Sequence, residues 1–179
     1  MGKEIFGKDL GRFLYCSSLL EERIANAYEH LSKLVDDVFV GGLLSFIARD
    51  SLKHAECFRV ASEMLSGGID VPVEACEKVW GETWKTLVVD AERFLAKREI
   101  GAEEIASLIN GLMKLESFAA EEYLTVMHVK LVESMADESK IDLENLRAVF
   151  EWIIEDEKRH EQILKMIEKM LTKRNEYKI

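Results

Sequence analysis

The sequence predicts an all-α fold in which long antiparallel helices pack as a four-helix bundle. Apolar residues recur at alternating steps of three and four over long stretches, which is the period of helices with one buried face. The chain contains one proline and ten glycines in 179 residues, too few for the frequent turns of a β-sandwich or β-barrel. This length fits a single domain over residues 1–179.

The first predicted hairpin joins helices over about residues 8–35 and 40–66. Asp36 and Asp37 separate its two apolar stripes, and Gly67 suits the left-handed conformation that ends a helix. The stripe positions are Leu10, Leu14, Ser17, Glu21, Ile24, Tyr28, Leu31 and Val35 in the first helix, and Leu44, Ile47, Ser51, His54, Phe58, Ala61 and Leu65 in the second.

A long connection over residues 69–101 follows, and we expect it to contain one helix over about 73–97. Pro72 stands just before this helix, where its fixed φ is favourable. Trp80 and Trp84 lie on the apolar face, so we expect them to cover the bundle rather than to form a cofactor site.

The second predicted hairpin joins helices over about 102–134 and 142–174. The polar segment 135–141 forms its loop, and Asp142 is suited to cap the start of the last helix. The stripe positions are Ile105, Ile109, Leu112, Glu116, Ala119, Tyr123 and Val126 in the third helix, and Leu146, Phe150, Ile153, Glu157, His160, Leu164, Ile167 and Leu171 in the fourth.

The net charge is −10, from 24 Lys and Arg against 34 Asp and Glu. Nucleic acids and anionic membranes bind basic patches, so we predict neither as a partner. No stretch approaches the roughly 18–20 apolar residues of a membrane span. Cys16, Cys57 and Cys76 form no C-x-x-C pair. We therefore expect reduced thiols in a cytoplasmic protein, with Cys57 as a small buried side chain.

Polar residues occupy stripe positions at the middle of all four helices. They are Glu21, Ser51, His54, Glu116, Glu157 and His160. An unpaired carboxylate buried among apolar side chains costs on the order of several kcal/mol. Three carboxylates and two imidazoles directed at one core need a shared compensating charge, which a divalent metal ion supplies.

These polar residues are also predicted to lie at one level of the bundle. Glu21 and His54 are nearly equidistant in sequence from the first turn, and Glu116 and His160 are nearly equidistant from the loop of the second hairpin. At 1.5 Å per residue, both pairs lie roughly 25 Å from their turn.

The two hairpins repeat a pattern. The first and third helices each carry a Glu seven residues before a Tyr, and the second and fourth share an i, i+3 pair that ends in His and lies on one face. The matched segments are Glu21 to Tyr28 with Glu116 to Tyr123, and Asp50-Ser51-x-x-His54 with Asp156-Glu157-x-x-His160.

Four stretches carry a resemblance to a known family: EERIANAYEHL, IARDSLKHAECF, LESFAAEEYL and IIEDEKRHEQIL. They resemble the ferritin-like di-iron carboxylate proteins, and among these the rubrerythrins, over roughly residues 8–174. The resemblance implies a ferritin-like bundle whose long crossover between helices 2 and 3 carries an extra helix. It also implies iron, two ions per chain, with one ion or another divalent metal as alternatives. The implied metal ligands are Glu21, His54, Glu116, Glu157 and His160, surrounded by Tyr28, Tyr123, Ser51 and Asp50.

One position departs from the family pattern, which has a metal-bridging Glu where this chain has Ser51. Asp50 lies about 100° away around its helix, and Glu161 lies about 40° off the stripe of the fourth helix. Either residue, or a water molecule, is an alternative ligand. Loss of a bridging carboxylate makes the site more open and more positive, which leaves open whether one metal binds or two.

The resemblance implies an oxidoreductase that reduces hydrogen peroxide or reacts with O₂, and a homodimer or higher homo-oligomer. Rubrerythrins carry a rubredoxin domain with two C-x-x-C pairs, which this sequence lacks. A separate electron donor is therefore expected. The alternative is a ferritin-like bundle that binds metal, or serves a structural role, without turnover.

Several of these residues can also be interpreted as structural residues that bind no metal. His54 has the alternative of a hydrogen-bonded core histidine, because its partner Glu is absent. Tyr28 and Tyr123 either pack in the core or place their hydroxyl groups on ligand carboxylates. His30 and His128 fall off the stripes, so we expect them to face solvent.

Overall fold

The computed structural model describes residues 2–67, 72–100, 102–126 and 143–176. All regular secondary structure in these ranges is helical, which confirms the predicted all-α class. The elements are α1 (Gly2–Leu34), α2 (Val38–Ser66), the 3₁₀ helix η1 (Val73–Ala75), α3 (Cys76–Trp80), α4 (Glu82–Leu95), α5 (Ala102–Val126) and α7 (Leu143–Glu176).

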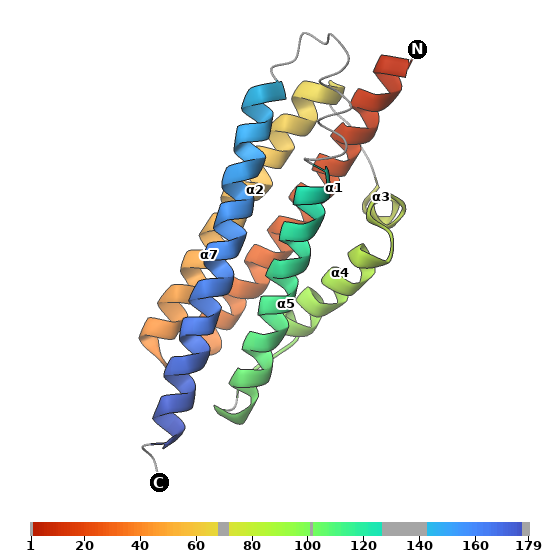
Figure 1. The fold of residues 1–179 in the computed structure, drawn as a ribbon. Coiled ribbons are helices and arrows are strands. Elements are labelled where there is room, and N and C mark those ends of the chain that lie inside the picture. The colour runs from red at the N-terminus through yellow and green to blue at the C-terminus, as the bar shows by residue number, and fades with distance from the viewer. Residues whose placement is uncertain (1, 68–71, 101, 127–142, 177–179) are drawn as a thin grey trace.

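The four longest helices, α1, α2, α5 and α7, run side by side along the molecule (Figure 1). α2 ends at the opposite end from the start of α5. The short helices η1, α3 and α4 therefore carry the chain back along the length of the molecule, and α4 packs against both α1 and α5. Apolar residues of all these α-helices form one buried core between them.

The α1–α2 hairpin is a close antiparallel pair with a short turn. Asp37 caps α2, since its side chain accepts hydrogen bonds from the backbone N–H groups of Phe39 and Val40 at 2.9 and 3.1 Å. A Cβ at Gly41 would lie 2.8 Å from the backbone oxygen of Ser32, so this close approach of the two helices requires glycine. Gly67, with φ of 70°, ends α2 as its sequence position predicted.

The connection after α2 differs from the single helix predicted over 73–97. Gly81 has φ of 68° and ψ of −148°, a conformation outside any helix, and it separates α3 from α4. Glycine adopts this conformation without the steric cost that a side chain imposes. Trp80 and Trp84 are buried, as predicted, and Trp80 stacks on Phe13 of α1 with ring centroids 5.0 Å apart.

The expectation of three reduced thiols is wrong for two of the cysteines. Cys16 on α1 and Cys76 on α3 form a disulfide across 60 residues of sequence, with both side chains fully buried. Cys57, expected to be a small buried side chain, is exposed and free. No short motif predicts a pairing over such a separation, because the pairing depends on how α3 packs against α1.

The two histidines outside the stripes have different outcomes. His30 is partly buried and does not simply face solvent, because its Nε2 donates a hydrogen bond to the backbone oxygen of Lys97 at 2.7 Å. His128, the end of the third predicted helix at 127–134, the loop 135–141 and Asp142 lie outside the described residues.

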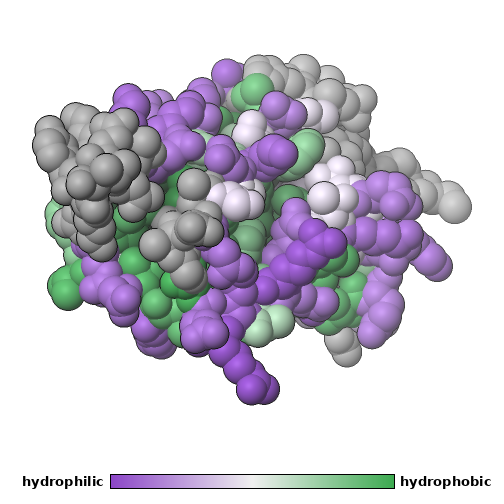
Figure 2. Space-filling model, turned by 90° about the horizontal axis from the view of Figure 1, so that it is seen from below, coloured by the Kyte–Doolittle hydropathy of each residue, from purple (hydrophilic) through white to green (hydrophobic). Residues whose placement is uncertain are grey.

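Figure 2 views the end of the molecule that carries the α1–α2 turn. Polar side chains cover most of the described surface there, and hydrophobic patches show between them. Val38 and Phe39, at the start of α2, are among the exposed apolar residues. Among the described helices, none combines the length and the apolar character needed to cross a membrane.

Candidate metal centre

The polar residues of the four stripes are all buried in the core. Glu21 comes from α1, Ser51 and His54 from α2, Glu116 from α5, and Glu157 and His160 from α7, and none is more than 3% exposed. All of them except Ser51 assemble into two groups that share one carboxylate, each with ligand atoms within 4.8 Å of one another. Buried acidic and imidazole groups of this kind can hold a metal ion.

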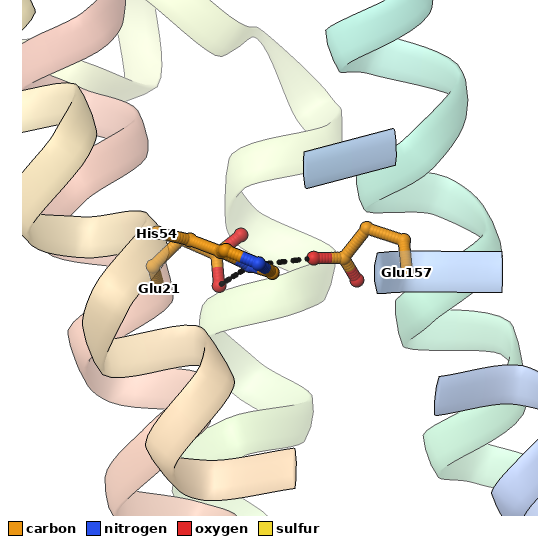
Figure 3. Close-up of side chains that lie close together, drawn as sticks. All are labelled: Glu21, His54 and Glu157. Atoms are coloured by element: carbon orange, nitrogen blue, oxygen red, sulfur yellow. Dashed lines mark ion pairs between the residues drawn. The ribbon is translucent and has the colours of Figure 1, made fainter. Parts of the chain in front are cut away.

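The first cluster contains Glu21, His54 and Glu157, whose side chains point toward one another from α1, α2 and α7 (Figure 3). Nδ1 of His54 lies 3.0 Å from Oε1 of Glu157 and 3.8 Å from Oε2 of Glu21. One imidazole nitrogen therefore faces two carboxylates in a region closed to solvent.

The second cluster contains Glu116, Glu157 and His160. Nδ1 of His160 lies 3.1 Å from Oε2 of Glu116 and 3.7 Å from Oε2 of Glu157. Glu157 thus turns one carboxylate oxygen toward each histidine. A carboxylate in this position is suited to bridge two ions.

Two aspartates hold the far side of the imidazole rings. Oδ2 of Asp50 lies 3.3 Å from Nε2 of His160, and Oδ2 of Asp156 lies 3.3 Å from Nε2 of His54. Each contact fixes the proton on Nε2 and leaves Nδ1 directed at the clusters. Asp50 therefore contacts a histidine from outside and does not take the place of the missing Glu. The role of Asp156 was not predicted, although its match with Asp50 in the sequence repeat was the available signal.

The two tyrosines make crossed contacts between α1 and α5. Tyr28 on α1 donates a hydrogen bond to Oε1 of Glu116, and Tyr123 on α5 donates one to Oε1 of Glu21. Burial, followed by the charge of these carboxylates, raises the pKa of both phenols well above its usual value. Both tyrosines therefore keep their protons and act as donors to the Glu side chains.

Ser51 interrupts the symmetry of the site. It occupies the position that Glu157 holds in the repeat, its side chain is 1% exposed, and its Oγ has no hydrogen-bond partner. Glu161, the other alternative ligand considered from the sequence, belongs to neither cluster and pairs with Lys165 at 2.5 Å. No protein side chain among the described residues replaces the missing carboxylate in the two clusters.

Unpartnered polar atoms gather at this site. Four buried side-chain atoms in the described part of the chain lack a hydrogen-bond partner, and three of them are Ser51 Oγ, His54 Nδ1 and Glu157 Oε1. His54 Nδ1 and Glu157 Oε1 are close, but their orientation does not make a hydrogen bond. Buried polar atoms left in this way are costly, and a metal ion between them would satisfy both. The donor set therefore fits a metal.

Three carboxylates surround the two imidazoles and raise the pKa values of both histidines. Burial disfavours a charged His54, but Glu157 and Glu21 outweigh it and raise its pKa to about 11. Burial is likewise outweighed at His160, where Glu116 and Glu157 raise the pKa to about 10. Without metal, protons on the two imidazoles thus balance part of the carboxylate charge.

Two of the buried carboxylates have pKa values shifted in opposite directions. Burial, followed by the charge of Glu157, raises the pKa of Glu116 to about 8. Burial and the charge of Glu21 also oppose ionisation of Glu157, but hydrogen bonding from its neighbours outweighs them and lowers its pKa. Glu157 is therefore the ionised carboxylate at the centre of the site.

No protein-family model, curated protein or solved structure matched this chain. The resemblance to rubrerythrins stays a prediction from sequence. The chemistry of the chain is therefore inferred from the geometry of its two clusters.

Proposed function

We propose that the chain is a ferritin-like four-helix bundle that holds two iron ions and acts as a rubrerythrin-like oxidoreductase on hydrogen peroxide or O₂. One observation carries this proposal. Glu157 is shared by two Glu/His clusters, while its Oε1 and Nδ1 of His54 lie buried without hydrogen-bond partners. An isolated core histidine would need neither a shared carboxylate nor a second matching cluster.

The donor set favours iron over softer metals. In this proposal Glu21 and His54 would hold one ion and Glu116 and His160 the other, and Glu157, which belongs to both clusters, would serve both ions. Carboxylate oxygens suit hard ions and imidazoles suit iron, whereas no thiolate takes part in either cluster. The helical segments η1, α3 and α4 between α2 and α5 support this proposal, because the resemblance implies a long crossover with an extra helix between helices 2 and 3.

A pair of iron(II) ions supplies two electrons, which with two protons suffice to reduce hydrogen peroxide to two water molecules. The protein residues prepare the site for this chemistry. Tyr28 and Tyr123 hold the buried Glu116 and Glu21 in place through hydrogen bonds. In this proposal a peroxide or water molecule binds beside Ser51, whose buried Oγ has no hydrogen-bond partner. A separate protein or small molecule then returns the electrons.

The direct test is the metal content per chain after anaerobic loading with Fe(II) and removal of loosely bound ions. We expect about two ions, as the two Glu157-sharing clusters provide two sites. The Fe(II) of the loaded protein should then be oxidised at the same rate as hydrogen peroxide is consumed. Failure to retain iron, zinc or manganese would contradict the proposal.

The second candidate function is metal binding without turnover, and Ser51 is the observation that favours it. With one bridging carboxylate missing, the site has fewer negative groups to hold a second ion. Retention of about one ion, without peroxide consumption, would support this alternative. Peroxide consumption by the loaded wild-type protein therefore separates the two. If the oxidant binds beside Ser51, a Ser51→Glu variant should consume less peroxide than the wild type.

Assembly is the remaining part of the proposal. The sequence resemblance implies a homodimer or higher homo-oligomer. Size-exclusion chromatography with light scattering measures this directly, and a monomer at micromolar concentration would contradict it.

A further inference from the structure

A cavity of about 210 Å³ lies between α5 and α7 and reaches the metal centre. Its walls include Glu116 and Glu157, which are 1% and 3% exposed, and also exposed residues such as Ser117 and Glu121. The cavity, which we call the α5–α7 groove, therefore connects the protein surface with two carboxylates of the second cluster.

Small side chains keep the α5–α7 groove open. Ser117 and Ala120 line it from α5, the first directly after Glu116 and the second about one helical turn along. A larger residue at position 120 would fill space that this wall leaves empty. Two larger cavities elsewhere in the molecule are lined by none of the cluster residues, so they do not offer the same connection.

Two features of the groove point to a cation. Glu157, at its buried end, has an oxygen without a hydrogen-bond partner. Glu121 and Glu161 add carboxylates to the lining, against the single ammonium group of Lys158. Lys165 pairs with Glu161 at 2.5 Å and offsets part of this charge.

We propose that the α5–α7 groove is the path by which divalent metal ions reach the centre, and that Glu121 and Glu161 attract the ion at its mouth. This inference rests on the metal centre proposed above. An ion that passes these carboxylates meets Glu116 and Glu157 next. The positive charge of Lys158 repels the ion, so its removal should change the loading rate in the opposite direction to removal of the two glutamates.

The test follows Co²⁺ binding by stopped-flow visible absorption, with Co²⁺ alone as the probe. The double variant Glu121→Gln/Glu161→Gln should load about threefold to tenfold more slowly at low salt, and the difference should shrink at high salt. Lys158→Gln should load faster than the wild type. The final amount of bound metal should be the same in all of them, because none of the three residues is a proposed ligand.

Two controls match these variants. Glu63→Gln/Glu74→Gln changes the net charge equally at exposed positions outside the groove, and its loading rate should equal that of the wild type. Ala120→Leu narrows the groove without changing charge and should slow loading at every salt concentration. Asn26→Leu introduces the same side chain at an exposed position of α1, also without a change in charge, and should leave the loading rate unchanged.

The outcomes distinguish the two proposals. Full metal content with unchanged rates in the Glu121/Glu161 and Lys158 variants would overturn the path while leaving the metal centre intact. Equal slowing by the Glu63/Glu74 control would also overturn it, because net charge alone would then account for the effect. A wild-type protein that binds no metal would overturn the proposed function and the path together.

Discussion

The first and second clusters contain the same kinds of side chain but differ in how they are satisfied and reached. In the second cluster, Nδ1 of His160 is hydrogen bonded to Glu116, and the α5–α7 groove leads to the surface. In the first cluster, Nδ1 of His54 has no hydrogen-bond partner, and Ser51 beside it on α2 has none either. If a metal ion binds as proposed, the second cluster is the side that it reaches first, and the first cluster is the side where it satisfies more unpartnered atoms.

A covalent constraint adds to this difference. The Cys16–Cys76 disulfide closes a loop of chain that contains both Glu21 and His54. Glu116 and His160 lie outside that loop. Two of the three residues of the first cluster therefore lie within a covalently closed loop, whereas the second cluster has none there.

The largest expected effect comes from removing this constraint. A Cys16→Ala/Cys76→Ala variant should lose up to about 4 kcal/mol of unfolding free energy, since the disulfide closes a loop of 60 residues. Chemical denaturation with a chelator present measures it without any contribution from metal. Cys57→Ser, at an exposed free thiol, is the matched control and should change stability by less than about 0.5 kcal/mol. A double variant as stable as the wild type would show that the disulfide does not constrain the unfolded chain.

The next largest effect is expected from changing Glu157, the carboxylate that both clusters share. Glu157→Gln keeps the shape of the side chain but removes the charge that serves both clusters. Metal affinity should fall by more than about 100-fold, beyond the loss typical for a residue that only supports a ligand. Isothermal titration with Co²⁺ measures it, and Glu155→Gln, an exposed neighbour on α7, should bind as the wild type does. Loss of only one of two ions would mean that Glu157 serves a single cluster.

A smaller effect separates the clusters. If the unpartnered atoms of the first cluster favour metal most, His54→Ala should weaken the first binding step about tenfold more than His160→Ala does. Competition with a coloured chelator at less than one equivalent of metal measures that step. Equal losses would show that the hydrogen bond between His160 and Glu116 does not distinguish the two halves.

The smallest expected effect is the release of protons when metal binds. The raised pKa values of His54 and His160, about 11 and about 10, mean that both imidazoles are protonated at pH 7 without metal. Metal needs neutral imidazole and ionised carboxylate, and Glu116 also holds a proton at pH 7 because its pKa is raised to about 8. Binding should therefore release about one proton from the first cluster and about two from the second, and apparent affinity should rise with pH. Titration calorimetry in buffers of different ionisation enthalpy counts these protons. Identical heats in all buffers would contradict the expected protonation.

The same shifts predict the pH dependence of the metal-free protein. A histidine whose pKa is raised on folding adds stability below its unfolded value of about 6.5. That contribution is lost as the pH rises through about 10 to 11. The metal-free protein should therefore unfold more easily at alkaline pH than at neutral pH.

The sequence was most informative where helical periodicity applies. The stripes predicted the long helices, and they singled out Glu21, His54, Glu116, Glu157 and His160 as inward residues, all of which are buried. Periodicity works here because one buried face repeats over many turns, so each polar interruption stands out.

The rest depended on contacts between elements that no local pattern encodes. The break at Gly81 comes from a positive φ of 68°, which helical periodicity does not predict. The Cys16–Cys76 bond and the contact of His30 with Lys97 both join α1 to the connection after α2. Asp156 lies off the stripe, so its contact with His54 was visible only through the repeat.

The disulfide also has a consequence for peptide-bond cleavage. Together with the backbone from residue 16 to residue 76, it makes a covalent ring. A single proteolytic cut inside that ring opens it without releasing a fragment, and two pieces separate on a gel only after reduction. Glu21 and His54 therefore remain parts of one molecule after any single cut between them.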